Sequence, residues 1–192
     1  MGRNPKTETG LRRAVFLDRD GVINDTVDRG ENVFVQDKKV RWTAPWRHDE
    51  FHCKDGVAVA LEEFGKLGFL KILVTNQPDV VYGNMSQLEY DKIMADIKEL
   101  SLDDIFVCMH GRDDGCECKK PKPGMLISAA QKWGIDLKKS FMVGDSESDI
   151  KASQAAGCKT ILIDCAQNKN LKADARVTNL SEAVRYIHEN IY

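Results

Sequence analysis

Two pairs of carboxylates each follow a short apolar run. Asp18 and Asp20 occur in FLDRDGVIN, and Asp145 and Asp149 occur in VGDSESD. Alternate residues of an extended segment point the same way, so Asp18 and Asp20 can face one crevice. Adjacent carboxylates repel unless a cation separates them or one is protonated, and a third carboxylate beside them suits Mg²⁺. An Asp-Gly turn that ends a strand is the structural alternative for the first pair alone.

A hydroxyl and two ammonium groups lie between these acidic segments. LVTNQ supplies Thr75, and KKPKP supplies Lys119 and Lys120. Hydroxyl and ammonium groups are potential ligands of phosphate oxygens. Acid pair, threonine, lysine and distal acid, in this order, form a pattern far more specific than any one part.

Soft metal ligands gather just before the lysines, in a CxH-x5-CxC spacing. The four residues are Cys108, His110, Cys116 and Cys118. Three sulfurs and one imidazole suit tetrahedral Zn²⁺, and a chance cluster of reduced cysteines is the alternative. A closed four-ligand site leaves no position for water, so we expect a structural zinc. Such a zinc would rigidify this loop and hold Lys119 and Lys120 ready for the phosphate.

The composition excludes several function classes. The chain has 192 residues, of which 42% are hydrophobic and 30% charged, as in an ordinary globular protein. A formal net charge of −2 gives no field that would attract nucleic acid or an anionic membrane. No apolar run approaches the roughly 20 residues that span a bilayer, and the start lacks the apolar segment of a signal peptide. We therefore expect a cytoplasmic protein with reduced cysteines.

The functional residues are placed by an alternation of apolar runs and amphipathic stretches. Strands are predicted at 14–18, 69–76, 104–110, 141–145, 159–164 and near 175–179. Helices are predicted at 56–68, 86–100, 123–134, 148–157 and 181–190. Asp55 is predicted to cap the first helix, and Ser86 with Glu89 to form a capping box on the second.

This alternation predicts a Rossmann-like three-layer α/β/α sandwich with a mainly parallel sheet. The carboxyl ends of parallel strands share one edge, which brings Asp18, Thr75 and Asp145 to one crevice. We expect residues 1–192 to form a single domain, with 1–12 disordered or loosely attached. Residues 19–54, which show little periodicity, would form a flap, and with the zinc loop at 108–118 they would make a minimal cap.

The quoted segments resemble, in order, the four motifs of the haloacid dehalogenase superfamily, over residues 14–164. The resemblance implies that Asp18 is the nucleophile that forms an aspartyl-phosphate, and that Asp20 is the general acid and base. It also implies that Mg²⁺ is bound by the Asp18 carboxylate, the Asp20 backbone carbonyl and Asp145, with Asp149 at or just behind these ligands. Thr75 and Lys120 would bind the phosphoryl oxygens.

FLDRDGVIN, TNQ, the cysteine loop and KPKPGM are similar, more narrowly, to the D-glycero-D-manno-heptose 1,7-bisphosphate phosphatases and the related histidinol-phosphate phosphatases. This branch implies a small sugar-phosphate-like substrate. The residues expected to contact it are Asn24, Asp28, Arg29, Asn76, Gln77 and Lys119.

The segment after the threonine departs from the heptose enzymes. It reads TNQPDVVYG, with Pro78, Asp79 and Tyr82 in place of small or basic residues. An acid gained where an arginine is lost weakens any second anionic contact, so a bisphosphate substrate fits less well than a monophosphate.

Two other function classes remain as hypotheses. One is a zinc-stabilised module that binds phosphorylated ligands without cleaving them, although both Asp18 and Asp20 are present. The other is a nucleic-acid end phosphatase, which the net charge and the lack of a basic, aromatic stripe disfavour. We expect a monomer that acts on a small-molecule phosphate ester, without nucleic-acid or membrane partners.

Several reactive side chains receive no catalytic role. Cys158 and Cys165 are expected to be small buried hydrophobes. His48 and His52 are expected to be a surface pair rather than metal ligands. Two tryptophans of the 19–54 stretch, Trp42 and Trp46, fit either a lid over the crevice or a satellite core.

Overall fold

A computed structural model describes residues 10–191 of the chain. Its strands are β1 (Arg13–Leu17), β2 (Val27–Val35), β3 (Lys38–Thr43), β4 (Phe69–Asn76), β5 (Asp104–Cys108), β6 (Phe141–Gly144), β7 (Lys159–Ile163) and β8 (Ala175–Val177). Its helices are α1 (Val57–Lys66), α2 (Gln87–Lys98), α3 (Gly124–Trp133), α4 (Glu147–Ala156) and α5 (Leu180–Glu189), with two short 3₁₀ turns, η1 (His48–Glu50) and η2 (Leu137–Lys139). None of the described helices is long and apolar enough to cross a membrane.

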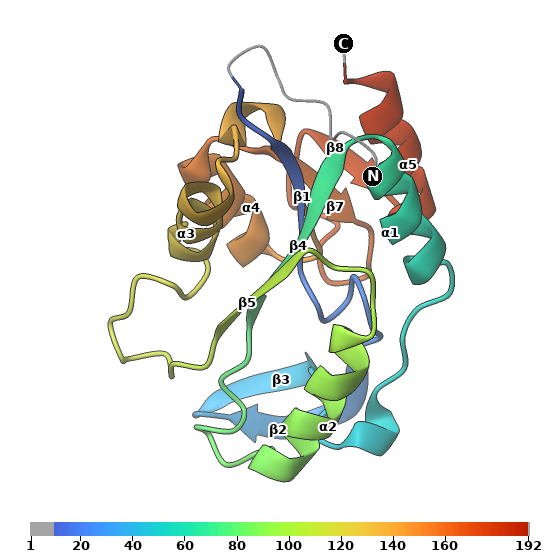
Figure 1. The fold of residues 1–192 in the computed structure, drawn as a ribbon. Coiled ribbons are helices and arrows are strands. Elements are labelled where there is room, and N and C mark those ends of the chain that lie inside the picture. Colours follow the sequence, from blue (N-terminus) through green and yellow to red (C-terminus); the bar gives the residue numbers. More distant parts are fainter. Residues whose placement is uncertain (1–9, 192) are drawn as a thin grey trace.

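The main sheet has six parallel strands in the order β5-β4-β1-β6-β7-β8. Strand β1 lies at its centre, between β4 and β6, and the chain passes to opposite sides of β1 in its two halves (Figure 1). In open α/β sheets the ligand crevice lies outside the carboxyl ends of the strands at such a switch point. The predicted three-layer α/β/α fold with a mainly parallel sheet is confirmed.

Two hydrophobic clusters cover the two faces of this sheet. Val15 and Leu17 of β1 join the cluster that contains α1, α2 and α5. Ala14 and Phe16 join the cluster that contains α3 and α4. Because successive side chains of a strand point to opposite faces, one continuous apolar run serves both layers.

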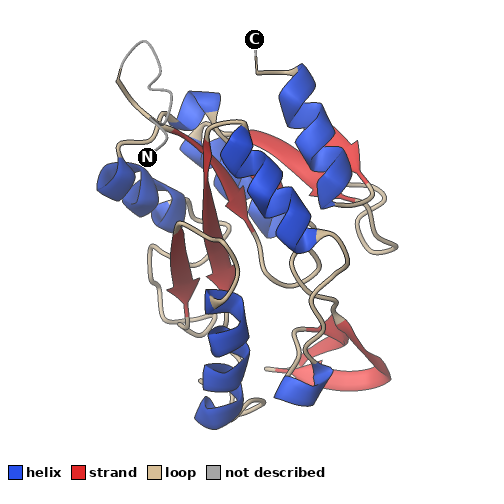
Figure 2. Cartoon of the chain, turned by 45° about the vertical axis from the view of Figure 1, so that its right-hand side comes forward, coloured by secondary structure: helices blue, strands red, loops and turns tan. Residues whose placement is uncertain are grey.

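Residues 19–54 contain an antiparallel hairpin, which the pattern of the sequence does not predict. Strands β2 and β3 form a separate two-stranded sheet, which stands apart from the main sheet in Figure 2. Gln36 and Asp37 turn the chain with positive φ angles of 48° and 59°, as a two-residue hairpin turn requires. The strands are mostly partly or fully exposed, so they lack the alternation of apolar residues that would reveal them.

Two predicted helix caps differ from the structure. Gly56, not Asp55, is the N-cap of α1, and no side chain caps that helix. Ser86 caps α2 by accepting a hydrogen bond from the Glu89 backbone N–H. The carboxylate of Glu89 is used elsewhere, because it accepts from the backbone N–H of His48 at 2.6 Å. A tertiary contact has thus replaced the second half of the predicted capping box.

The start of the chain was expected to be disordered or loosely attached over residues 1–12, and residues 1–9 of that range lie outside the described part. Arg12, which is described, donates its backbone N–H to the Gly134 carbonyl at 2.7 Å. It also forms a parallel bridge with Ile135.

Candidate active site

The carboxyl edge of the sheet brings distant functional residues together. Asp18 follows β1 directly, Thr75 is the penultimate residue of β4, and Asp145 follows β6. Strand β1 pairs with both β4 and β6, with Leu17 opposite Leu73 and Val143. The register therefore places these residues at one level of the sheet, as parallel pairing predicts.

Three carboxylates form a candidate cation site at this edge. Asp18, Asp145 and Asp149 each offer an oxygen atom within 4.8 Å of the others. The local backbone requires glycine, because a Cβ atom at Gly21 would collide with the Asp145 carboxylate and one at Gly144 with Asp149. Clustered carboxylate oxygens fit a hard cation such as Mg²⁺, which commonly uses one or two carboxylates together with water and phosphate.

The electrostatics of these carboxylates also suit a cation. Burial, followed by the neighbouring acids, raises the pKa of Asp145 to about 8. Burial raises the pKa of Asp18 to about 6, although Lys120 opposes the rise. Desolvation and like charge disfavour ionised carboxylates, and a bound divalent ion offsets both effects.

Lys120 lies between two of these acids. Its Nζ is 2.9 Å from Asp18 Oδ1 and 2.6 Å from Asp149 Oδ1, and its side chain is 1% exposed. Burial alone would lower the Lys120 pKa, but the carboxylates of Asp149 and Asp18 outweigh burial and raise it. The lysine is therefore a fixed positive charge beside the proposed nucleophile.

Asp149 has partners for both of its oxygens. Oδ1 accepts from Lys120, and Oδ2 accepts from the Ser146 hydroxyl at 2.6 Å and from the Ser146 backbone N–H at 3.1 Å. A carboxylate so occupied fits the predicted place just behind the cation better than a place among its direct ligands. It also caps α4 together with Ser146.

The carboxylate of Asp20 lies outside this cation cluster. Its Oδ1 accepts from Arg19 and from Asn24 Nδ2 at 3.0 Å, and its Oδ2 accepts from Gln77 Nε2 at 2.7 Å. Gln77 Nε2 also donates to Thr75 Oγ1 at 2.9 Å. Asn24 and Gln77, which were predicted as substrate contacts, hold the proposed acid–base residue here.

Arg19 is a site residue that the sequence analysis did not single out. Its side chain is fully buried, which is rare for arginine unless the residue is paired. The only signal in the sequence is its place between two aspartates, directly after a buried strand.

Asn76 and Lys119 act on the loop that carries Lys120. Asn76 accepts a hydrogen bond from the Lys120 backbone N–H at 3.0 Å and donates one to the Lys120 carbonyl at 3.0 Å. Lys119 Nζ donates to the His110 carbonyl at 2.8 Å. Strand β4 and the cysteine loop therefore both position the lysine segment.

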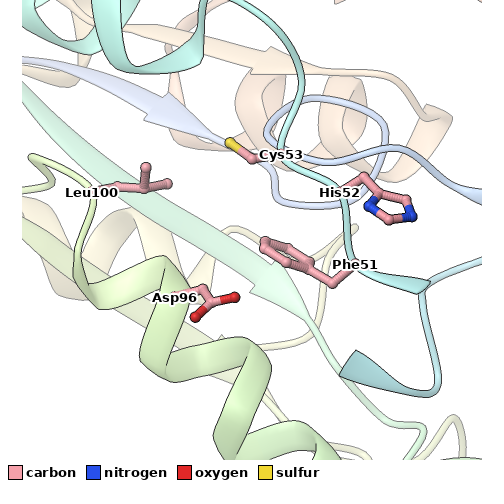
Figure 3. A pocket seen from close by; sticks show the side chains of 5 residues that line it. All are labelled: Phe51, His52, Cys53, Asp96 and Leu100. Atoms are coloured by element: carbon pink, nitrogen blue, oxygen red, sulfur yellow. The ribbon is translucent and has the colours of Figure 1, made fainter. Parts of the chain in front are cut away.

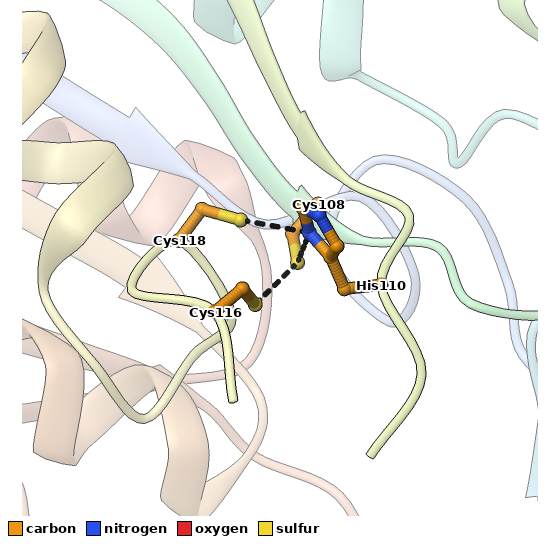
Figure 4. A group of neighbouring side chains, drawn as sticks. All are labelled: Cys108, His110, Cys116 and Cys118. Atoms are coloured by element: carbon orange, nitrogen blue, oxygen red, sulfur yellow. Dashed lines mark hydrogen bonds between the residues drawn. The ribbon is translucent and has the colours of Figure 1, made fainter. Parts of the chain in front are cut away.

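The cysteine loop brings its four candidate ligands into one cluster (Figure 4). Cys108 Sγ lies 3.7 Å from Cys116 Sγ and 3.5 Å from His110 Nδ1, and His110 Nδ1 lies 3.2 Å from Cys118 Sγ. Zn–S bonds of about 2.3 Å place tetrahedral sulfurs about 3.8 Å apart, which is close to the cysteine pair distance here. Burial and the adjacent thiols raise the pKa of Cys118 to about 12, so a cation is needed to ionise the whole set.

The flap fixes two further predicted substrate contacts by internal ion pairs. Asp28 pairs with Arg41 at 2.8 Å on the hairpin surface. Arg29 pairs with Glu50 at 2.6 Å and stacks 4.0 Å above the ring of Trp46. Neither residue appears in the hydrogen-bonded network around Asp18, Asp20 and Lys120.

The two tryptophans of the flap have different environments. Trp46 donates from Nε1 to Asp79 Oδ1 at 3.1 Å and thus connects the flap to the segment after β4. Burial raises the pKa of Asp79, which also accepts from Asn84. Trp42 is 40% exposed and lines a cavity.

That cavity, of about 520 Å³, opens onto Asp145, and its size suits a small-molecule ligand. Its lining includes Asp25, Glu147, Asp164 and the ammonium group of Lys54. The excess of carboxylates favours an uncharged, hydroxyl-rich group over a second phosphate.

A second cavity, of about 310 Å³, lies between α2 and the segment after η1 (Figure 3). Phe51, His52, Cys53, Asp96 and Leu100 line it, and no predicted site residue is among them. Nearby, His48 Nε2 lies 2.8 Å from Asp96 Oδ2, and neither His48 nor His52 belongs to a candidate metal-binding group of the described residues. Cys158 is buried, as expected, and Cys165 is partly exposed.

Curated relatives cover nearly the whole chain. A D-glycero-beta-D-manno-heptose-1,7-bisphosphate 7-phosphatase of Helicobacter pylori is 32% identical over 184 residues, which are 91% of this chain and 97% of the relative. The enzyme of the same name from Vibrio cholerae is 36% identical over 187 residues, 90% of this chain and 92% of the relative. A family model described as HAD-hydrolase-like matches residues 117–189.

The chain belongs to the haloacid dehalogenase (HAD) family of hydrolases. Among solved structures, D,D-heptose 1,7-bisphosphate phosphatase from B. bronchiseptica, complexed with magnesium and phosphate, matches with a TM-score of 0.75 and 27% identity. The match covers 93% of this chain and 99% of that one. A putative HAD-like phosphatase from Mesorhizobium loti, 23% identical over 93% of this chain and 87% of its own, has the same fold with a TM-score of 0.70. The predicted membership and the prediction of a phosphatase are thereby confirmed.

Proposed function

We propose that this HAD phosphatase hydrolyses the phosphate monoester of a small, sugar-like metabolite through an aspartyl-phosphate at Asp18, with Mg²⁺ as cofactor. The observation that carries the proposal is the contact between the Asp18 carboxylate and the buried Lys120, beside the Asp145 carboxylate. A nucleophile, a fixed positive charge and a cation site at one sheet edge meet the electrostatic needs of phosphoryl transfer.

Each of the proposed catalytic residues has a separate role. Asp18 attacks phosphorus, while Thr75 and Lys120 bind the oxygens of the transferring group. Asp20 donates a proton to the leaving oxygen, and later takes one from the water that hydrolyses the aspartyl-phosphate. Asp18, the Asp20 backbone carbonyl and Asp145 would hold Mg²⁺, with Asp149 behind them. The ion would neutralise phosphate charge during transfer.

The relatives are named for heptose 1,7-bisphosphate, and we infer an activity most like that of a D,D-heptose 1,7-bisphosphate 7-phosphatase. The carboxylate-rich cavity beside Asp145 and the buried Asp79 both disfavour a second phosphate near them. The same features leave histidinol phosphate, a monophosphate with an amine, as the alternative substrate. Asn24, Asp28, Arg29, Asn76, Gln77 and Lys119 remain the proposed substrate contacts, directly or through the residues they hold.

The cysteine loop, we infer, binds a structural Zn²⁺. The ligand-atom distances support this inference, and so does the donor set of three sulfurs and one imidazole. We further propose a monomer that acts in the cytosol, where its six free cysteines would stay reduced.

The decisive experiment measures phosphate release with Mg²⁺ from heptose phosphates, heptose bisphosphates, hexose phosphates, histidinol phosphate and nucleotides. Asp18→Asn should abolish turnover while its circular dichroism spectrum and melting temperature stay close to those of the parent. Asp91→Asn, on the exposed surface of α2, is the matched control and should keep full activity. An Asp18→Asn variant that retains the parent rate would refute the proposal.

A further inference from the structure

The Asp20 carboxylate is held asymmetrically. Its Oδ1 accepts three hydrogen bonds: from Arg19 Nε at 3.1 Å, from Arg19 Nη2 at 2.8 Å and from Asn24 Nδ2 at 3.0 Å. Its Oδ2 accepts one, from Gln77 Nε2 at 2.7 Å. A carboxylate oxygen has about two lone-pair directions, so Oδ1 is saturated and Oδ2 keeps one direction open.

The local turn does not need the arginine side chain. The backbone of Arg19 builds the turn, since its carbonyl accepts from the N–H groups of Val22, Ile23 and Asn24. Its own N–H donates to Asp18 Oδ1 at 2.7 Å. Within the described residues, the arginine side chain hydrogen-bonds to Asp20 alone. The buried Arg19 side chain therefore acts on the Asp20 carboxylate.

Holding Asp20 in this way costs stability. Each of the three residues that donate to Asp20 keeps one buried polar atom without a partner among the described residues: Arg19 Nη1, Asn24 Oδ1 and Gln77 Oε1. A buried polar atom without a hydrogen-bond partner destabilises the folded state. When both partners of a buried ion pair are replaced by apolar side chains of similar size, the protein is often as stable as before or more stable. A fold selected for stability alone would not place all three around one side chain.

We propose that Arg19 is a positioning residue that, with Asn24, fixes the Asp20 carboxylate so that Oδ2 exchanges the proton with the leaving group. The inference rests on the acid–base role proposed for Asp20. The Oδ2 proton passes to the ester oxygen as the P–O bond breaks and Asp18 becomes phosphorylated. Water then attacks the phosphorus of the aspartyl-phosphate and gives its proton to Oδ2. This step releases phosphate, returns Asp18 to a free carboxylate and leaves Asp20 protonated again.

Leaving-group dependence separates this role from a structural one. p-Nitrophenolate leaves without a proton, whereas the alkoxide of benzyl alcohol needs one, so only benzyl phosphate depends on a well-placed acid. The experiment compares kcat/KM on these two esters, with Mg²⁺, for Arg19→Met, Arg19→Lys and Asp20→Asn. Arg13→Met is the matched control, because Arg13 lies at the opposite end of β1 and packs on Phe69.

General acid catalysis contributes about 10²–10⁴-fold, so Asp20→Asn should lose about that factor on benzyl phosphate and far less on p-nitrophenyl phosphate. Arg19→Met should lose at least ~10-fold on benzyl phosphate and less than about threefold on p-nitrophenyl phosphate. Arg19→Lys, which restores one donor, should fall between Arg19→Met and the parent. Arg13→Met should leave the ratio of the two rates unchanged.

Thermal melting supplies a second readout. Arg19→Met should melt below the parent, because the largely buried Asp20 carboxylate loses its paired cation. If Asp20→Asn discriminates between the two esters but Arg19→Met loses kcat/KM equally on both, or on neither, the proposal for Arg19 is overturned. If Asp20→Asn itself fails to discriminate, the acid–base role falls and the inference falls with it. If Arg19→Met does not fold, the ester ratio of Arg19→Lys decides in the same way.

Discussion

Lys120 places one positive charge between two carboxylates at the buried edge of the sheet. Its ammonium contacts Asp18, which directly follows β1, and Asp149, which lies in α4. The same contacts that orient the proposed phosphate-binding lysine therefore also hold two layers of the fold together. Removing one partner of a buried ion pair leaves an uncompensated charge. This lowers the stability of the fold by much more than the intact pair contributes to it.

Lys120→Met should lower the free energy of unfolding by about 3–5 kcal/mol, because Asp149 stays buried without its cation. Urea denaturation measures this change, and phosphate release should fall to background in the same variant. Lys119→Met is the control, since Lys119 is only partly buried and donates to one carbonyl. Its stability should change by about 1 kcal/mol or less. Equal destabilisation in both variants would contradict the argument.

At the scale of elements, the cysteine loop and strand β4 together position the lysine segment. Cys108 ends β5 inside the core, and Cys116 and Cys118 pack against the same hydrophobic cluster. The segment between Cys108 and Cys116 is largely exposed and contains Gly111 and Gly115. A loop of this kind has little core of its own, so a metal would supply most of its order.

Cys116→Ser should remove one equivalent of zinc and lower kcat, because the segment that carries Lys120 loses its anchor. Elemental analysis measures the zinc, and hydrogen exchange should rise in residues 109–119 while the main sheet stays protected. Cys53→Ser is the control, since Cys53 is exposed and lies outside the cluster. Full zinc content and unchanged exchange in Cys116→Ser would show that the loop is ordered without the metal.

The sequence predicted those elements that carry an apolar run or a helical period. Strand β1 is apolar on both faces, so its run of residues and the polar Asp18 after it mark the site directly. The β2–β3 hairpin was missed because its strands are largely exposed and its pairing shifts between Asp28 and Val33. Ordinary strand signals require either an apolar run or regular alternation.

The site was predictable as a set of residue types, but its internal pairing was not. Asp18, Asp145 and Lys120 were expected together because parallel strands share an edge. The contact of Lys120 with Asp149 joins residues 29 positions apart, and it depends on how α3 and α4 cover the sheet. Arg19 was overlooked because arginine is mostly found on protein surfaces.

At the scale of the whole molecule, a chain of nearly balanced charge concentrates acids at one edge. The net charge is −2, yet three carboxylates offer oxygens within 4.8 Å of each other. Without a cation, burial and these neighbours raise the pKa of Asp145 from 3.8 to about 8. Between these values Asp145 is more often protonated in the folded chain than in the unfolded chain, so the contribution of Asp145 to stability falls as pH rises through this window.

Mg²⁺ should therefore stabilise the protein more at pH 8 than at pH 6. At pH 8 the ion meets carboxylates that are closer to full ionisation and offsets their repulsion, whereas at pH 6 it must displace a proton. Thermal melting with and without Mg²⁺ at the two pH values measures the difference. In Asp145→Asn, which lacks the titrating ligand, the Mg²⁺-induced shift should be small at both pH values. A parent protein with an equal or larger shift at pH 6 would show that Asp18 and Asp145 do not share an ion.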